Sequence, residues 1–152
     1  MTRVHLMIST AVALWCVLLV LAPLLAHMDL VAPSGILYLF FSKICHQQAS
    51  RSFFIFGKQM AVCSRCTALY FGFLFGTLLY PLLQRTMKDL QPPKILLLFA
   101  AIPIVIDFSL GGLGILENTF LTRSITGLIL GSVVAFYIIP GLKNIFMEFS
   151  KK

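Results

Sequence analysis

Three of the four cysteines and one of the three histidines fall within a stretch of 22 residues that could bind a soft metal ion. Cys45 and His46 are adjacent, and Cys63 and Cys66 form a Cys-x-x-Cys pair. At the start of a helix, two cysteines three residues apart lie one turn apart on the same side, which suits either a metal or a disulfide. We predict that these four side chains bind one Zn²⁺. Two residues adjacent in sequence rarely both bind one tetrahedral ion, so either Cys45 or His46 could instead contact a ligand without binding the metal itself.

The Cys-x-x-Cys pair has an electrostatic environment that favours thiolates. It lies where a helix is predicted to begin, and Arg65 adds a positive charge between the two cysteines. A helix N-terminus and a nearby cation both lower the pKa of a thiol. Thiolates favour metal binding and redox exchange alike, so a disulfide or zinc staple and a reactive site both stay open.

The remaining cysteine and histidines lack such neighbours. Cys16 lies midway along an apolar stretch, where a cysteine usually behaves as a small hydrophobic residue. His5 and His27 stand alone near the ends of that stretch. We expect both histidines to be solvated.

A second group of polar residues surrounds an aspartate in an apolar stretch. Asp107 needs a partner, because an ionisable group inside a membrane is costly unless it is paired or hydrated. Arg123 is the predicted partner, with Glu117 and Asn118 completing the cluster. A structural ion pair is favoured over a proton relay, but Asp107, Glu117 and Arg123 are also the candidate catalytic residues. The other polar residues assigned to the site are Gln47, Arg51, Arg65 and Asn118.

The composition shows that helices in a membrane must position these residues. Of 152 residues, 59% are hydrophobic and 11% are charged, whereas soluble domains carry roughly 25% charged residues. Too little polar surface remains for a soluble fold, and the aromatic content excludes a disordered chain. The net charge of +7 is explained by anionic lipid headgroups. We therefore expect a lipid bilayer as partner and no nucleic acid.

Four stretches are long and apolar enough to cross a bilayer, which takes roughly 20 residues of helix. They predict an all-α integral membrane four-helix bundle that forms a single domain over residues 1–152. A shorter apolar run, 35–41, is expected to be an interfacial or re-entrant segment between the first two helices. The predicted spans cover residues 6–26, 64–83, 95–114 and 124–142.

An even number of spans puts both termini on one side of the membrane. That side would carry seven lysines and arginines, and the other side five. The positive-inside rule then predicts that both termini are cytoplasmic and that the cysteines face outward. Two glycine pairs, Gly72/Gly76 and Gly127/Gly131, are expected to bring helices into close contact within the bundle rather than between two copies.

The order and spacing of these motifs resemble a family of small predicted membrane proteins of bacteria and archaea, classed as a domain of unknown function. The resemblance runs from about residue 44 to residue 131 and implies a prokaryotic cytoplasmic membrane protein, but no reaction. The chain departs from the family pattern at Ala68 and Phe108, where the family has glycine. The residues that carry the resemblance are Cys45-His46-Gln47, Arg51-Ser52-Phe53, Cys63-Ser64-Arg65-Cys66-Thr67, Asp107, Arg123 and Thr126-Gly127.

Several functions remain compatible with this sequence. A metal with a coordination position open to water could hydrolyse a substrate, with Asp107 or Glu117 as the base, whereas a closed site would only fold the loop. Alternatively, the protein could be a quinone-linked thiol-disulfide oxidoreductase in which Cys45 passes electrons to the Cys-x-x-Cys pair and quinone lies near Tyr70. It could also be a non-catalytic accessory subunit that packs against other membrane proteins.

Overall fold

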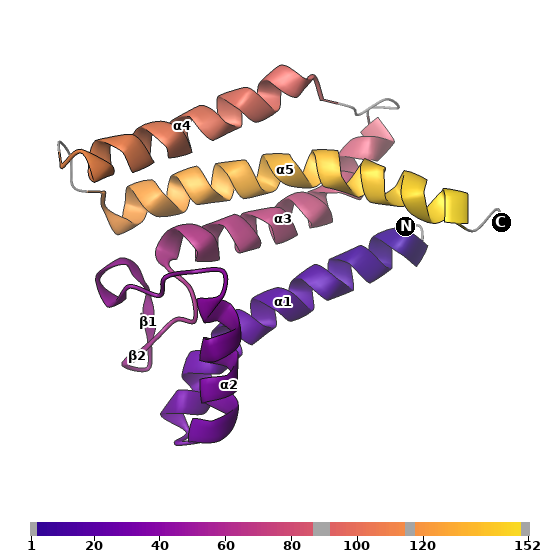
Figure 1. The fold of residues 1–152 in the computed structure, drawn as a ribbon. Helices are drawn as coiled ribbons and strands as arrows, with labels where there is room; N and C mark the ends of the chain where they lie inside the picture. Colours follow the sequence, from indigo (N-terminus) through magenta and orange to yellow (C-terminus); the bar gives the residue numbers. More distant parts are fainter. Residues whose placement is uncertain (1–2, 87–91, 115–117, 150–152) are drawn as a thin grey trace.

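The computed structural model describes residues 3–86, 92–114 and 118–149, which form a largely helical structure (Figure 1). This part of the chain contains four long helices, with one short helix, a 3₁₀ turn and a two-stranded hairpin between the first and the second of them. The elements in chain order are α1 (Arg3–His27), α2 (Val31–Ser42), η1 (Ala49–Arg51), β1 (Phe54–Ile55), β2 (Lys58–Gln59), α3 (Ser64–Thr86), α4 (Lys94–Gly112) and α5 (Phe120–Phe149).

The four long helices are each apolar and long enough to cross a membrane. They coincide with the four predicted spans to within a few residues, and their outward surfaces carry large exposed apolar side chains, as lipid-facing helices do. The predicted all-α membrane bundle is confirmed. The candidate spans are Arg3–His27, Ser64–Gln84, Lys94–Gly112 and Phe120–Lys143.

The arrangement of the helices separates the molecule into two ends. In Figure 1, α5 lies between α4 and α3, and α1 lies on the other side of α3. The start of α1 and the end of α5 are at one end, whereas α2 and the hairpin are at the opposite end. The residues that could do chemistry lie at the α2 end.

Glycines bring α3 and α5 into direct backbone contact. A methyl group at Gly72 of α3 would overlap the carbonyl oxygen of Leu128, and one at Gly131 of α5 would overlap the carbonyl oxygen of Leu69. Two helices approach this closely only where neither carries a side chain. Both glycine pairs therefore pack inside the bundle, as the sequence predicts.

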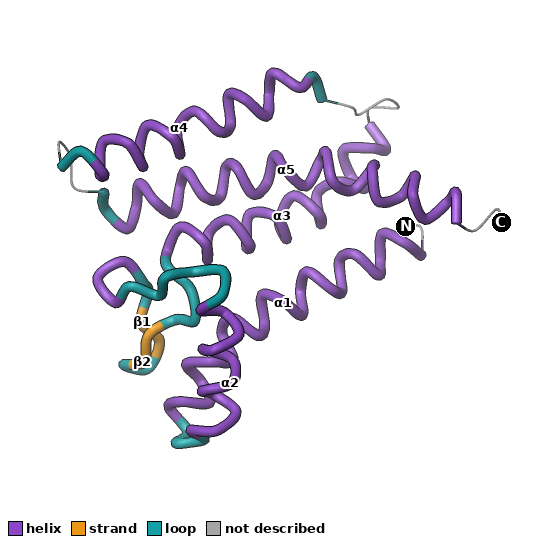
Figure 2. Tube along the Cα trace, in the orientation of Figure 1, coloured by secondary structure: helices purple, strands orange, loops and turns teal. Residues whose placement is uncertain are grey.

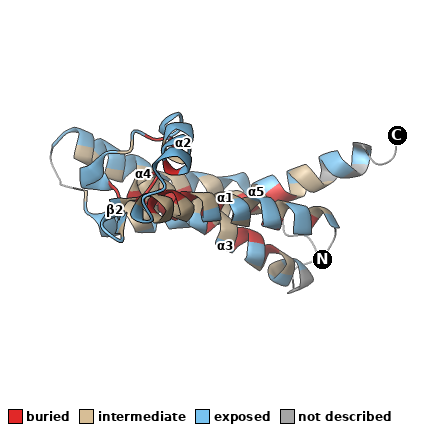
Figure 3. Ribbon diagram, turned by 90° about the horizontal axis from the view of Figure 1, so that it is seen from below, coloured by how far each residue is buried: buried red, intermediate tan, exposed pale blue. Residues whose placement is uncertain are grey.

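The largest buried cluster joins α1, α2 and the start of α3. Leu19 of α1 and Phe41 of α2 are fully buried, and the Trp15 ring packs edge-on against Phe41 and Tyr70, with ring centroids 5.4 and 5.8 Å apart. Figure 3 shows these buried residues concentrated toward the end that carries α2 and β2. The cysteines belong to this cluster or lie against it.

The short helix α2 folds back onto α1. It has 12 residues, too few to cross a bilayer, in agreement with the short segment predicted between the first two spans. The hydroxyl of Ser34 is buried and donates a hydrogen bond of 3.0 Å to the carbonyl of Ala22. This contact joins α2 to the second half of α1.

The β-hairpin between α2 and α3 was not predicted from the sequence (Figure 2). Its strands pair Phe54 with Gln59 and Ile55 with Lys58 in antiparallel register. The two turn residues, 56 and 57, both have positive φ, 52° and 74°, as in a type I′ turn. Gly57 is the usual signal for this turn, but a phenylalanine before it is not.

One expectation about the histidines is wrong. His5 is buried because α1 packs against α3 at this level, where the His5 ring stacks on Tyr80 with ring centroids 6.0 Å apart. The hydroxyl of Ser9 donates a hydrogen bond to the backbone carbonyl of His5. His27 is exposed, as expected, and its ring stacks on Phe56 of the hairpin at 5.0 Å.

The α3–α5 contact can be tested with two glycines of the same helix. We expect Gly131→Ala to cost about 1–3 kcal/mol of unfolding free energy, because its methyl group meets the backbone of α3. Gly141→Ala is the control, since nothing lies within 4 Å of its added methyl group. The control should gain up to about 1 kcal/mol from helix propensity. Thermal unfolding in detergent checks both variants, and equal effects would contradict the close contact.

Candidate metal centre and arginine pocket

Three cysteine side chains converge at the α2 end of the bundle. The Sγ atoms of Cys45, Cys63 and Cys66 all lie within 4.8 Å of one another. Cys45 is buried and the other two are partly buried. Three sulfur atoms at this spacing can hold one metal ion, or two of them can form a disulfide.

Local structure explains why the three sulfur atoms meet. Cys63 immediately precedes α3 and its carbonyl accepts the first helical hydrogen bond, from the backbone N–H of Thr67 at 2.9 Å. Cys66 therefore lies one turn further on the same side of the helix. Cys45 follows α2, and its backbone N–H bonds the carbonyl of Phe41 at 3.0 Å.

The environment of Cys45 stabilises a thiolate. Its Sγ accepts a hydrogen bond of 3.2 Å from the backbone N–H of Cys63. Hydrogen bonds from the side chains of Cys63 and then Cys66 lower the pKa of Cys45, although burial opposes them. A thiolate is the form of cysteine that binds metals, so Cys45 is poised as a ligand.

Gln47 connects the segment after Cys45 to the segment before Cys63. Its Nε2 donates hydrogen bonds of 2.8 Å to the carbonyls of Tyr38 and Ala61. Its own backbone has a positive φ of 49°, a conformation that side chains rarely adopt. This turn brings Cys45 and Cys63 to the same place.

His46, which the sequence predicts as a ligand, and Cys16, which it does not, both lie apart from the three sulfur atoms. The His46 side chain is exposed, and it is not part of the group of three converging sulfur atoms. Cys16 is buried in α1, where its Sγ lies 3.6 Å from the carbonyl oxygen of Tyr70. The structure thus brings together three of the four side chains that the sequence predicts as ligands.

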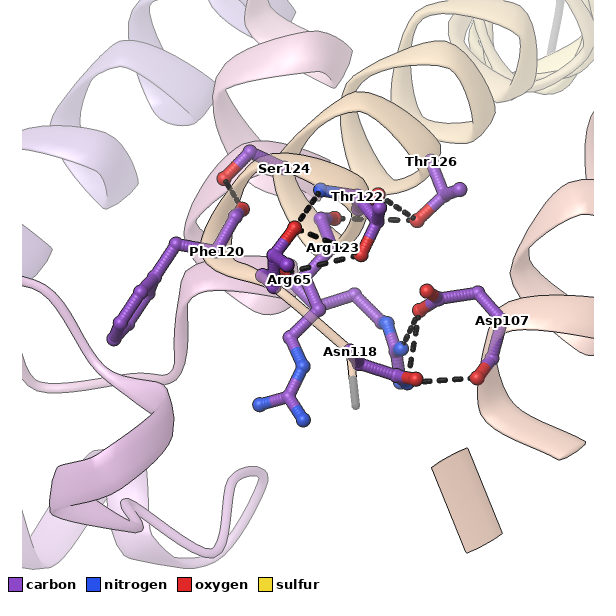
Figure 4. Close-up of polar contacts among 9 residues, drawn as sticks. Arg65, Asp107, Asn118, Phe120, Thr122, Arg123, Ser124 and Thr126 are labelled. Atoms are coloured by element: carbon purple, nitrogen blue, oxygen red, sulfur yellow. Dashed lines mark hydrogen bonds and ion pairs between the residues drawn. The ribbon is translucent and has the colours of Figure 1, made fainter. Parts of the chain in front are cut away.

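Asp107 forms the centre of a second polar group, shown in Figure 4. Its carboxylate pairs with the guanidinium of Arg65 on α3, and the two side chains are only 10% and 20% exposed. Asn118 donates hydrogen bonds to the backbone carbonyl of Asp107 at 2.7 Å and to the carboxylate at 3.2 Å. These contacts tie α4 to α3 and to the residues before α5.

The predicted pairing of Asp107 with Arg123 is wrong. In Figure 4 the Arg123 guanidinium points away from Asp107, and the guanidinium of Arg65 forms the ion pair with the carboxylate instead. Both arginines lie in the first turn of their helices at the same end of the bundle, and Arg65 reaches α4. Glu117, the other residue assigned to this group, lies outside the described residues.

Arg51, Arg65 and Arg123 line one cavity of about 590 Å³ at this end. Arg51 comes from η1, Arg65 from the start of α3 and Arg123 from the start of α5. Glycines at the end of α4 form another wall, and Gly111 leaves space that the Asn118 side chain occupies. Of the polar residues that the sequence analysis assigns to the site, Arg51, Arg65 and Asn118 line this cavity, whereas Gln47 does not.

Comparison with known proteins identifies the family. The family model described as Predicted membrane protein (DUF2085) matches residues 45–137. The chain belongs to this family. The resemblance inferred from the motifs is therefore confirmed, and the matched segment of the DUF2085 protein contains both the cysteine group and the arginine cavity.

Relatives of this DUF2085 protein occur in archaea. An uncharacterized protein of Methanocaldococcus jannaschii is 44% identical over 104 residues, which cover 68% of this chain and 67% of the relative. An uncharacterized protein of Methanothermobacter thermautotrophicus is 36% identical over 88 residues, 58% of this chain and 78% of the relative. No solved structure matches the chain.

Sequence reasoning missed two residues that hold the cysteine segment of this DUF2085 protein in place. The hydroxyl of Tyr38 in α2 donates a hydrogen bond to the carbonyl of Gln59 in β2. Burial raises the pKa of Tyr38, so the phenol stays protonated and can donate. The Gln59 side chain in turn donates to the hydroxyl of Ser52 at 3.1 Å. These contacts depend on the hairpin, so no sequence motif marks them.

A double-mutant cycle can test which arginine pairs with Asp107. Asp107→Asn and Arg65→Gln should show a coupling energy of about 0.5–3 kcal/mol in the free energy of unfolding, because they share one ion pair. The cycle with Arg123→Gln should give a coupling below about 0.5 kcal/mol. Larger coupling to Arg123 than to Arg65 would contradict the observed pairing.

Proposed function

We propose that this DUF2085 protein is a membrane metalloprotein that binds one Zn²⁺ through Cys45, Cys63 and Cys66. The observation that supports the proposal is the convergence of three sulfur atoms within 4.8 Å of one another. With Zn–S bonds of about 2.3 Å, sulfur atoms on a tetrahedron lie about 3.8 Å apart. Small side-chain adjustments are enough to reach this geometry.

The donor chemistry supports a soft ion. Thiolate ligands select zinc, copper(I) or iron–sulfur clusters over magnesium and calcium. The pKa of Cys45, lowered by hydrogen bonds from Cys63 and Cys66, favours the thiolate form of this ligand. Zn²⁺ is proposed because it accepts a tetrahedral thiolate set and requires no redox partner.

We assign the ion a structural role. It would link the residue that follows α2 to the first turn of α3, and so hold residues 43–63 against the bundle. Three protein ligands leave one position for water, as in hydrolytic zinc sites. The candidate base Asp107, however, already accepts hydrogen bonds from Arg65 and Asn118. A carboxylate held in this way is a poor general base, which favours the structural role.

We further propose that the protein lies in the cytoplasmic membrane of a prokaryote with both termini in the cytoplasm. The start of α1 and the end of α5 lie at one end of the bundle, and the start of α3, which carries the Cys-x-x-Cys pair, lies at the other (Figure 1). The excess of lysine and arginine on the side of the termini supports this orientation. The metal centre would then face the outside of the cell.

The same sulfur spacing supports one competing function, thiol-disulfide exchange. Cys45 and a cysteine of the Cys-x-x-Cys pair could form a disulfide and pass two electrons and two protons to a quinone. In this function quinone is expected near Tyr70, and Tyr70 packs against the buried cluster that contains Cys45. A role as accessory subunit would instead require a membrane protein partner that copurifies in mild detergent.

Metal content decides between zinc binding and thiol exchange. Protein purified without a nickel column should contain about one zinc per chain by mass spectrometry, and Cys63→Ser should lose it. Cys16→Ser is the matched control, since Cys16 lies outside the sulfur group, and it should keep the metal. Metal-free protein whose thiols react only after reduction would contradict the proposal and favour thiol-disulfide exchange.

A histidine variant tests the ligand set itself. His46→Ala should retain zinc at the wild-type level, because the exposed imidazole is not among the converging ligand atoms. Loss of zinc from this variant, with the fold intact by circular dichroism, would show that the four-residue set predicted from the sequence is the correct one.

A further inference from the structure

Among the residues that the structure describes, the cavity formed by the three arginines holds more positive than negative charge. Of the residues that the structure describes, Asp107 is the carboxylate that forms an ion pair there, and it pairs with Arg65. Arg51 and Arg123 have no ion-pair partner among the described residues. Three guanidinium groups around one cavity repel one another, and the Asp107 carboxylate offsets only part of this repulsion. An anion in the cavity would relieve this repulsion.

Two of the arginines that line the cavity also have a buried donor atom without an acceptor. The Nε atoms of Arg65 and Arg123 are buried and have no hydrogen-bond partner among the described residues. A buried donor without an acceptor is costly, and the cost is greater when the group is charged. A guanidinium satisfies its donors best against a carboxylate or phosphate, whose oxygen atoms match its planar geometry.

An apolar cleft adjoins the cavity. It has a volume of about 500 Å³ and lies between α4 and α5, where Ile102, Ile106 and Leu110 form much of its lining. Asn118 lines both the cleft and the arginine cavity, so the two spaces meet at this side chain. Ile106 is 52% exposed, and the cleft is therefore open on the lipid-facing side of the helices.

We propose that the arginine cavity and the apolar cleft together bind a lipid with a phosphate headgroup. The phosphate would lie among Arg51, Arg65 and Arg123, and an acyl or isoprenoid chain would lie along the cleft between α4 and α5. Charge complementarity selects the phosphate, and the adjoining apolar cleft at a helix end selects a lipid over a free anion.

The helix ends add to the attraction. α3 and α5 both begin at this cavity, and a helix N-terminus carries a partial positive charge that favours phosphate. The C-terminus of α4, which carries the opposite partial charge, also lies at the cavity. The Asn118 side chain lies against Gly111 there, in the space that glycine leaves. The site uses no cysteine side chain, but Arg51 belongs to the 43–63 segment that the proposed metal would hold in place, so its position rests on the proposed function.

Binding of three compounds to the full-length protein in detergent, measured by calorimetry, tests the proposal. The probes are dioctanoyl phosphatidic acid, dioctanoylglycerol and inorganic phosphate. The first should bind at least about tenfold more tightly than either of the others, because only it has both the charged group and the chains. Equal affinity for phosphatidic acid and dioctanoylglycerol would overturn the headgroup site.

Variants of both parts of the site sharpen the test. Arg51→Gln and Arg123→Gln should each weaken binding of phosphatidic acid roughly tenfold. Arg51 is exposed, so its variant is expected to fold. Lys58→Gln removes one charge from the hairpin at the same end and should leave the affinity unchanged, since Lys58 does not line the cavity. An equal loss in Lys58→Gln would indicate diffuse attraction and overturn the site.

The cleft is tested by filling it. Ile106→Trp should weaken binding of phosphatidic acid and leave binding of inorganic phosphate unchanged. If inorganic phosphate binds as tightly as phosphatidic acid and Ile106→Trp affects neither, the cavity is a site for free phosphate and the lipid proposal is overturned.

Discussion

The close approach of α3 and α5 is the contact on which the functional end of the molecule depends. At Gly127 of α5 an added methyl group would lie 2.6 Å from the carbonyl oxygen of Arg65. The contact therefore extends to the first turn of α3, where Cys66 and Arg65 lie. The contact fixes the relative position of the first turns of α3 and α5, and therefore it also sets the positions of Arg65 and Arg123 around one cavity.

The cysteine group depends in addition on a segment with little regular structure. Residues 43–63 return from α2 to α3 through a 3₁₀ turn and a short hairpin, and hydrogen bonds from Gln47 and Tyr38 hold them. Its buried apolar residues are Cys45 near one end and residues 60–62 near the other, with little between them. A metal that joins Cys45 to α3 would hold the two ends of this segment together.

Much of this structure follows from the sequence, because membrane spans and the Cys-x-x-Cys pair depend on local patterns. The errors concern contacts between distant residues. Arg65 and Arg123 both open helices at the same end, and only the packing of α3, α4 and α5 shows which of them reaches Asp107. His46 adjoins Cys45, but the positive φ at Gln47 belongs to a turn that the sequence does not reveal. The hairpin was missed because its strands have two residues each.

X-ray absorption at the zinc edge of the purified full-length protein tests the central claim most directly, because it reports the atoms bound to the metal. The three converging sulfur atoms predict three Zn–S distances of about 2.3 Å and one lighter ligand. A spectrum with only nitrogen and oxygen neighbours, or protein without zinc whose cysteines form a disulfide, would contradict the account.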